Sequence, residues 1–182
     1  MRRVPAEGHL SQLLKAVAIA KPQRERWLLE ELYDLLIPLD EDARVERSGF
    51  RDVLLVLSSR LRPHEISNAA QQLEFSFMSR LVPSTSIVRA GRREELFESL
   101  EPLLPSGRKL KLIVSLRGRG KEVVAEGELE ALVRFRGNLL SRQSQEVLVV
   151  ESLGEVFVIS FGITRRCGLS CTVVVPKEPT AF

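Results

Sequence analysis

Residues 109–121 have the sequence KLKLIVSLRGRGK, which carries the clearest structural signal in the chain. Its apolar residues recur at every second position, which predicts a β-strand with one buried face: Leu110, Leu112, Val114 and Leu116. Two glycines and three cations follow at residues 117–121, and a helix is expected over residues 122–135. The predicted order is therefore strand, basic glycine-rich turn, helix.

The segments around this strand complete an α/β unit. Upstream, an apolar stripe predicts a helix over residues 91–104, which ends before Pro105. Downstream, residues 146–152 and 155–163 predict a β-hairpin, and residues 169–175 predict a last strand. The second half of the chain thus alternates strands and helices.

The first half has a different pattern. Its expected elements are a strand within residues 11–20, a helix over 22–37, strands over 44–47 and 50–58 joined at Ser48 and Gly49, a helix over 63–73 and a strand over 75–82. This order is the ferredoxin-like split βαβ arrangement. The predicted fold class is therefore α+β, with a ferredoxin-like domain at residues 1–84 and an α/β domain at residues 85–182.

Length and charge limit the possible functions. At 182 residues the chain allows one ordinary domain or two small ones, which leaves no room for a binding module beside a full catalytic domain. The net charge of +3 arises in the second half, where 15 cations face 12 acids, whereas the first 84 residues carry 12 of each. Such basic blocks favour a polyanion as partner.

The basic turn at residues 117–121 is a candidate phosphate-binding site. Gly118 and Gly120 allow a sharp turn and close approach of the backbone, and guanidinium groups match phosphate oxygens with paired hydrogen bonds. The turn lacks the spacing of a nucleotide-binding P-loop and the third glycine of the dinucleotide fingerprint. An ordinary solvated turn remains the alternative.

Residues suited to catalysis or metal binding are scarce. The basic half contains no Asp and no His, so it is poorly equipped for acid–base work or for magnesium. Cys167 and Cys171 are too few for a zinc site, and we expect either buried thiols or a local disulfide. No catalytic residue, metal or cofactor is predicted, and the protein is expected not to be an enzyme.

Nothing in the sequence predicts a membrane anchor. No segment reaches the 18 apolar residues of a spanning helix, and Pro5 and Glu7 interrupt the N-terminal stretch where a signal peptide would be apolar. Together with the two cysteines, this predicts a cytoplasmic protein without a membrane partner.

Four segments carry a resemblance to a known family: FSFMSRLVPSTSIV at 75–88, GRREELFESLEPLLPSG at 91–107, KLKLIVSLRGRGKEV at 109–123 and QEVLVVESLGEVFVISFGI at 145–163. Their order resembles the THUMP-domain architecture of RNA-modification proteins, in which a basic module sits beside an N-terminal ferredoxin-like domain. The second domain is therefore expected to be THUMP-like.

The resemblance implies a free-standing THUMP protein, because no room remains for a catalytic domain. It is similar to the tRNA-binding adaptor of the acetyltransferase that makes N4-acetylcytidine in tRNA. Such a protein would hold tRNA near the acceptor stem and present it to a partner enzyme. The RNA contacts expected on this basis are the glycine turn, a second basic cluster and two arginines near the domain joint: Arg117, Gly118, Arg119, Gly120, Lys121, Arg134, Arg136, Arg142, Arg80 and Arg89.

Two other functions are compatible with the sequence. The basic surface could bind an acidic protein partner, which would make the chain a protein-interaction module. A small hydrolase or transferase acting alone is the least supported hypothesis, because acid–base residues are missing from the basic half.

Overall fold

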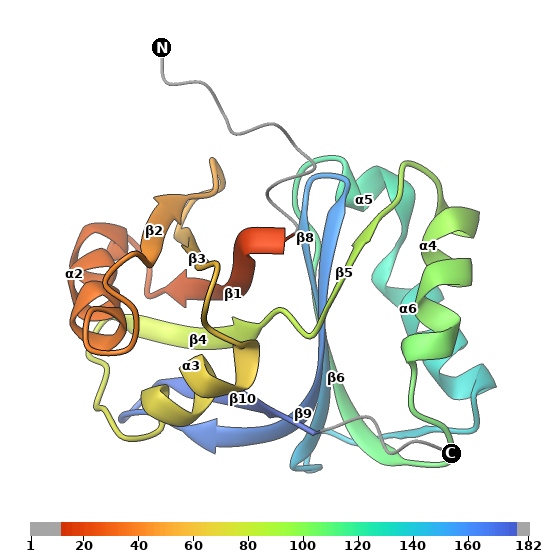
Figure 1. Cartoon of the computed structure of the whole chain (residues 1–182). Coiled ribbons are helices and arrows are strands. Elements are labelled where there is room, and N and C mark those ends of the chain that lie inside the picture. The colour runs from red at the N-terminus through yellow and green to blue at the C-terminus, as the bar shows by residue number, and fades with distance from the viewer. Residues whose placement is uncertain (1–11, 178–182) are drawn as a thin grey trace. The chain divides into compact units, whose positions relative to one another are not determined.

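The computed structural model describes residues 12–177 and divides into two compact units (Figure 1). The first unit contains the described residues up to Ser84 together with Arg165–Pro176, and the second contains Thr85–Thr164 and Lys177. Each unit has its own hydrophobic core. Residues 1–11, with His9 and the basic N-terminus, and residues 178–182 lie outside the described part.

The first unit has the strand and helix order predicted from the sequence. Its elements are β1 (Leu14–Ala20), α2 (Glu25–Leu36), β2 (Arg44–Arg47), β3 (Val53–Leu57), α3 (Pro63–Ala70) and β4 (Met78–Pro83). These strands form an antiparallel sheet in the order β2-β3-β1-β4, which is the split βαβ arrangement. A late strand, β10 (Thr172–Pro176), adds to this sheet parallel to β4.

The core of the first unit lies between its helices and its sheet. Helix α2 buries an apolar stripe at helical spacing: Leu28, Leu32, Leu35 and Leu36. The strand β3 is buried along its whole length. Cys167 and Cys171 lie in the same core and form a disulfide, so the local disulfide is the alternative that the structure shows.

The second unit is built around the strand with the clearest alternation. Its elements are β5 (Ser86–Arg89), α4 (Arg93–Leu100), a 3₁₀ turn (Glu101–Leu103), β6 (Lys109–Ser115), α5 (Gly120–Val123), α6 (Glu126–Phe135), β7 (Leu139–Leu140), β8 (Glu146–Leu153) and β9 (Val156–Arg166). The sheet is mixed, with β6 parallel to β7 and β8, and β9 antiparallel to β8 and β5. Arg165 and Arg166, at the end of β9, count with the first unit.

The predicted apolar face of β6 is confirmed. Leu110 is fully buried, and Leu112, Val114 and Leu116 pack against the same core. Helices α4 and α6 cover this face with Leu96, Leu100, Leu129 and Val133. The core therefore fixes the two ends of β6, where the basic segments lie.

Several boundaries differ from the sequence-based expectation. The helix predicted over residues 122–135 is split into α5 and α6, because Val124 is extended and Val123 and Val124 are buried in the core. The hairpin expected at Ser48 and Gly49 is wider, since Asp52 also has a positive φ of 59°. The short strands β5 and β7 were not predicted.

The chain leaves the first unit after Ser84 and returns to it at Arg165. Division into domains at residues 1–84 and 85–182 stays a prediction. In the structure β10 lies with the first unit, where Thr172 is opposite Arg80 and Val173 is opposite Leu81.

Candidate nucleic-acid interface

The basic glycine turn follows β6 and packs on the end of β8. Gly118 has a φ of +53°, in the left-handed region that favours glycine. Gly120 is buried, and a Cβ atom there would lie 2.2 Å from the Ser152 hydroxyl oxygen. The two glycines therefore serve the packing of the turn as well as its shape.

Arg117 is directed into the protein. Its backbone N–H donates to the Ser152 hydroxyl at 2.6 Å, and its guanidinium donates to the Glu151 carboxylate at 2.5 Å. The Glu151 side chain is fully buried, and that of Arg117 is 21% exposed. A buried carboxylate is very costly without a partner, so Arg117 neutralises Glu151.

Arg119 and Lys121 lie on the surface of this turn. The Arg119 guanidinium is 73% exposed and pairs with Glu155 at 2.7 Å. The hydrogen bond from Arg119 to Glu155 raises the pKa of the guanidinium. Lys121 is exposed and forms no ion pair within residues 12–177. One partly neutralised cation and one open cation thus face solvent.

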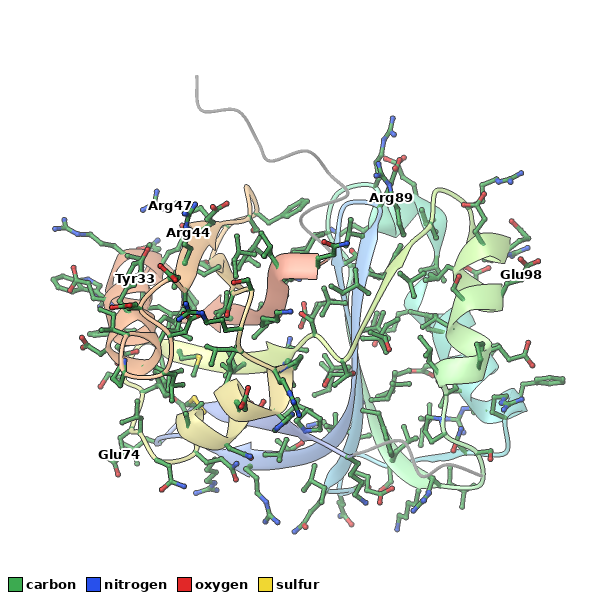
Figure 2. The ribbon with its side chains drawn as sticks, in the orientation of Figure 1. Tyr33, Arg44, Arg47, Glu74, Arg89 and Glu98 are labelled. Atoms are coloured by element: carbon green, nitrogen blue, oxygen red, sulfur yellow. A yellow bond between two sulfur atoms is a disulfide. The ribbon has the colours of Figure 1, made fainter. Side chains whose placement is uncertain are left out.

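Arg89 joins the same end of the second unit. It is the last residue of β5 and lies opposite Val156, and the next backbone N–H, that of Ala90, donates to the Glu155 carbonyl. Figure 2 shows the Arg89 side chain projecting outward at this edge. We call Arg89, Arg117, Arg119 and Lys121 the turn cluster.

A shallow hollow beside the turn cluster is lined by two arginines and three glutamates. It is lined by Gly91, Arg92, Arg93, Glu94, Glu122, Val123 and Glu128. Arg93 pairs with Glu94 at 3.0 Å and with Glu128 at 2.7 Å. The backbone N–H of Ala125, and then Arg93, lower the pKa of the Glu128 carboxyl. The glutamates outnumber the arginines in this hollow, which leaves little attraction for a phosphate.

The second predicted basic group lies at the opposite end of β6. The buried Asn138 amide donates to the carbonyls of Pro105 and Val133 at 2.7 and 3.0 Å, and its oxygen accepts the Arg108 N–H at 3.0 Å. This side chain ties the end of α6 to the start of β6.

The structure brings five cations to this end of the unit, which we call the corner cluster: Arg108, Lys109, Arg134, Arg136 and Arg142. Arg136 pairs with Glu101 at 3.5 Å, and Arg108 lies 3.8 Å from Glu146. The side chains of the other three are exposed and form no hydrogen bond or ion pair in the described part of the chain. Unneutralised positive charge therefore gathers here.

The turn and corner clusters do not form one patch. They lie at opposite ends of β6, which has seven residues and so spans about 23 Å. Arg80, also expected to contact RNA, is a partly buried residue of β4 in the first unit, opposite Ile19 and Thr172. Arg89 and Arg80, expected together near the joint, are on different units.

Two features of this surface were not predicted from the sequence. The first is the pair of acids on β8 and the β8–β9 turn that neutralise Arg117 and Arg119. The second is Phe135, 82% exposed between Arg134 and Arg136. A glutamate inside the apolar run of β8 and an aromatic residue flanked by arginines were the signals available.

Neither a metal-ligand group nor a membrane-spanning helix occurs within residues 12–177. No group of three or more His, Cys, Asp or Glu is placed to hold a metal ion. No helix in this part of the chain is long and apolar enough to cross a membrane.

Comparison with known proteins identifies the fold. No family model and no curated protein matches the chain. Among solved structures, a possible methylase from Clostridium difficile 630 matches with a TM-score of 0.55 and 13% identity, over 81% of this chain and 40% of that chain. TrmN from Thermus thermophilus matches with a TM-score of 0.55 and 18% identity, over 84% of this chain and 46% of that chain. PH1313 from Pyrococcus horikoshii Ot3 matches with a TM-score of 0.50 and 12% identity, over 83% of this chain and 57% of that chain.

These likenesses confirm the predicted fold class, a chain of mixed α and β structure, which the structure shows as helices packed on mixed sheets. This chain spans less than half of the first two matched chains. The expectation that the protein is not an enzyme is corrected, because the same fold occurs within a chain described as a possible methylase. Chain length and the scarcity of acid–base residues therefore do not exclude an enzyme.

Proposed function

We propose that this chain binds structured RNA, in particular tRNA, and presents it to an RNA-modifying active site. The resemblance to THUMP proteins favours N4-acetylation of cytidine by a tRNA acetyltransferase as the reaction served. One observation carries the proposal: the corner cluster holds three exposed cations that have no acidic partner among residues 12–177, in a half of the chain that supplies the whole net charge.

The chemistry of the corner cluster fits a phosphate backbone. Lys109, Arg134 and Arg142 can each displace condensed counterions from RNA, and that release favours binding at low salt. Arg136 and Arg108 are partly neutralised by Glu101 and Glu146, so they add less.

The turn cluster is a second, weaker phosphate contact in this proposal. Arg119 and Lys121 are exposed, but Arg119 must exchange its bond to Glu155 for a phosphate. Arg117 supports the turn from inside through Glu151, so its role is positioning. Two contact regions about 23 Å apart favour a ligand with an extended phosphate backbone.

A salt titration of tRNA binding tests the proposal. The variant Arg134→Gln/Arg142→Gln is compared with the parent and with Arg165→Gln/Arg166→Gln, which removes the same charge from exposed residues of the first unit. We expect the slope of log affinity against log salt to fall by about 0.7–0.9 per lost contact in the first variant only.

An unchanged affinity and slope in Arg134→Gln/Arg142→Gln would remove the corner cluster from the RNA interface. A competition assay adds the second control. If heparin of equal charge displaces the protein as well as tRNA does, the surface binds polyanions by charge alone, as expected for a module with an acidic protein partner.

A further inference from the structure

Phe135 is the most exposed aromatic side chain in residues 12–177. Its exposed fraction is 82%, compared with 45% for Trp27, and Trp27 also stacks on Phe77 with ring centroids 5.9 Å apart. No aromatic ring packs on Phe135 within residues 12–177. The ring is therefore open for contact.

The exposure follows from the geometry of α6. The helix buries Leu129 and Val133, and Phe135 lies two residues past Val133, about 200° further around the axis. The core therefore makes no use of the ring. Since Phe is normally buried for its large apolar area, a core-packing role does not explain this residue.

The surroundings of Phe135 are cationic. Arg134 and Arg136 flank it, and residues 131–145 contain no acid. The Glu101 carboxylate is paired with the neighbouring Arg136 at 3.5 Å. An apolar protein surface or an acidic peptide would each use only half of this arrangement, whereas a nucleotide offers both an aromatic face and a phosphate.

We infer that Phe135 is a stacking platform for an unpaired base of the bound RNA, with the adjoining phosphates on Arg134, Lys109 and Arg142. The inference rests on the proposed RNA-binding function and adds that the strand at the corner cluster is single-stranded. A base within a duplex has both faces covered by its neighbours, so an open ring selects unpaired nucleotides. Stacking of this kind tolerates any base.

Equilibrium binding of two matched ligands tests the inference: a single-stranded oligoribonucleotide of about ten nucleotides and the same sequence as a duplex. The variants are Phe135→Ala, Phe135→Trp and, as control, Leu139→Ala, which removes another exposed apolar side chain (67% exposed) from the same corner. We expect Phe135→Ala to weaken single-strand binding roughly 5- to 150-fold.

Three further results are expected. Phe135→Trp retains single-strand affinity, because indole also stacks, and Leu139→Ala leaves it unchanged. The salt slope of Phe135→Ala stays that of the parent, since no charge is lost. Its affinity for the duplex and its thermal midpoint also stay unchanged, because the ring is outside the core.

A fluorescence measurement gives an independent readout. The double variant Trp27→Phe/Phe135→Trp has a single indole at the proposed site, since the chain has only one Trp. Stacking of a base on this indole should quench its emission when the single strand binds. Binding without quenching would overturn the inference.

The two proposals fail differently. If Phe135→Ala binds the single strand as the parent does, or loses duplex and single strand equally, the stacking platform is refuted while the corner cluster can still bind RNA. If the parent protein binds no RNA at low salt, both proposals are refuted.

Discussion

The turn cluster and the corner cluster look alike in sequence and differ in the structure. Each contains two arginines close to glycine, in RGRGK at residues 117–121 and RFRG at residues 134–137. In the turn cluster, Glu151 and Glu155 pair with both arginines of the turn, whereas the corner cluster keeps three exposed cations with no ion-pair partner in the described part of the chain. The local density of positive charge is therefore a poor measure of the charge available to a ligand.

The difference arises from strand pairing. The acids that neutralise Arg117 and Arg119 are 34 and 36 residues away along the chain, at the end of β8 and in the β8–β9 turn. At the corner cluster, Glu101 pairs with Arg136 and Glu146 lies near Arg108, but within residues 12–177 no acid pairs with Lys109, Arg134 or Arg142. The following predictions test whether the two clusters have separate roles.

The largest effect is expected from Arg117→Met. The substitution leaves the fully buried Glu151 without this ion pair, which should lower the free energy of unfolding by about 3 kcal/mol. Chemical denaturation measures the change. Arg119→Met is the matched control, and we expect its unfolding midpoint to remain that of the parent because the Arg119 side chain is 73% exposed and solvent-screened ion pairs contribute little. Equal effects of the two variants would contradict the distinction between them.

Gly120→Ala should destabilise the turn cluster by about 1–3 kcal/mol through overpacking. The added Cβ would lie 2.6 Å from Cβ of Ser152, and Ser152 is itself buried. The control is Gly127→Ala in α6, where no atom lies within 4 Å of the new Cβ, so that about 0.5 kcal/mol of stabilisation is expected. Thermal unfolding of both variants would show opposite shifts.

RNA affinity gives a direct comparison of the two clusters. Arg134→Gln/Arg142→Gln should weaken tRNA binding about tenfold at moderate salt, and Arg119→Gln/Lys121→Gln should weaken it less, because Arg119 is already paired with Glu155. Filter binding at two salt concentrations measures both. A larger loss in the turn variant would reverse the assignment of the main contact.

The smallest expected effect is a pH-dependent change in stability from Glu128, which lines the hollow beside the turn cluster. The lowered pKa of Glu128 means that its stabilising contacts are present above the ordinary carboxyl pKa and are lost as the pH falls through the folded-state value. Glu128→Gln should therefore lower the unfolding midpoint at neutral pH, and the difference from the parent should shrink in acid. Glu130→Gln, on the same helix, is the control. If the difference in unfolding midpoint between Glu128→Gln and the parent stayed constant with pH, this account would be contradicted.

The elements with strong internal patterns could be predicted from sequence. The alternation in β6 identified its buried face, and β2 was predicted with the observed bounds. The split between α5 and α6 was missed because Val123 and Val124 fit an apolar helical stripe, and only their burial in the core shows that Val124 is extended. Strand β7 has two residues and exists because β6 offers a parallel partner.

The candidate site was predictable as a composition but not as a surface. The sequence identified the basic residues, yet their ion pairs depend on which strand lies beside which. Only Glu151 indicated such an ion pair from the sequence, because a carboxylate inside the apolar run of β8 is expected to be buried and to need a cation beside it. The exposure of Phe135 was not predicted, because an aromatic residue within a helical stripe is normally assigned to the core.

The return of the chain at Arg165 also has a consequence for biosynthesis. Strand β10 and the Cys167–Cys171 pair belong to the core of the first unit, but the ribosome makes them after all the strands of the second unit. The strand β4 therefore lacks its partner β10 while the second unit is synthesised. Although domains usually fold in order of synthesis, here the segment made first should be the last to reach its complete native sheet.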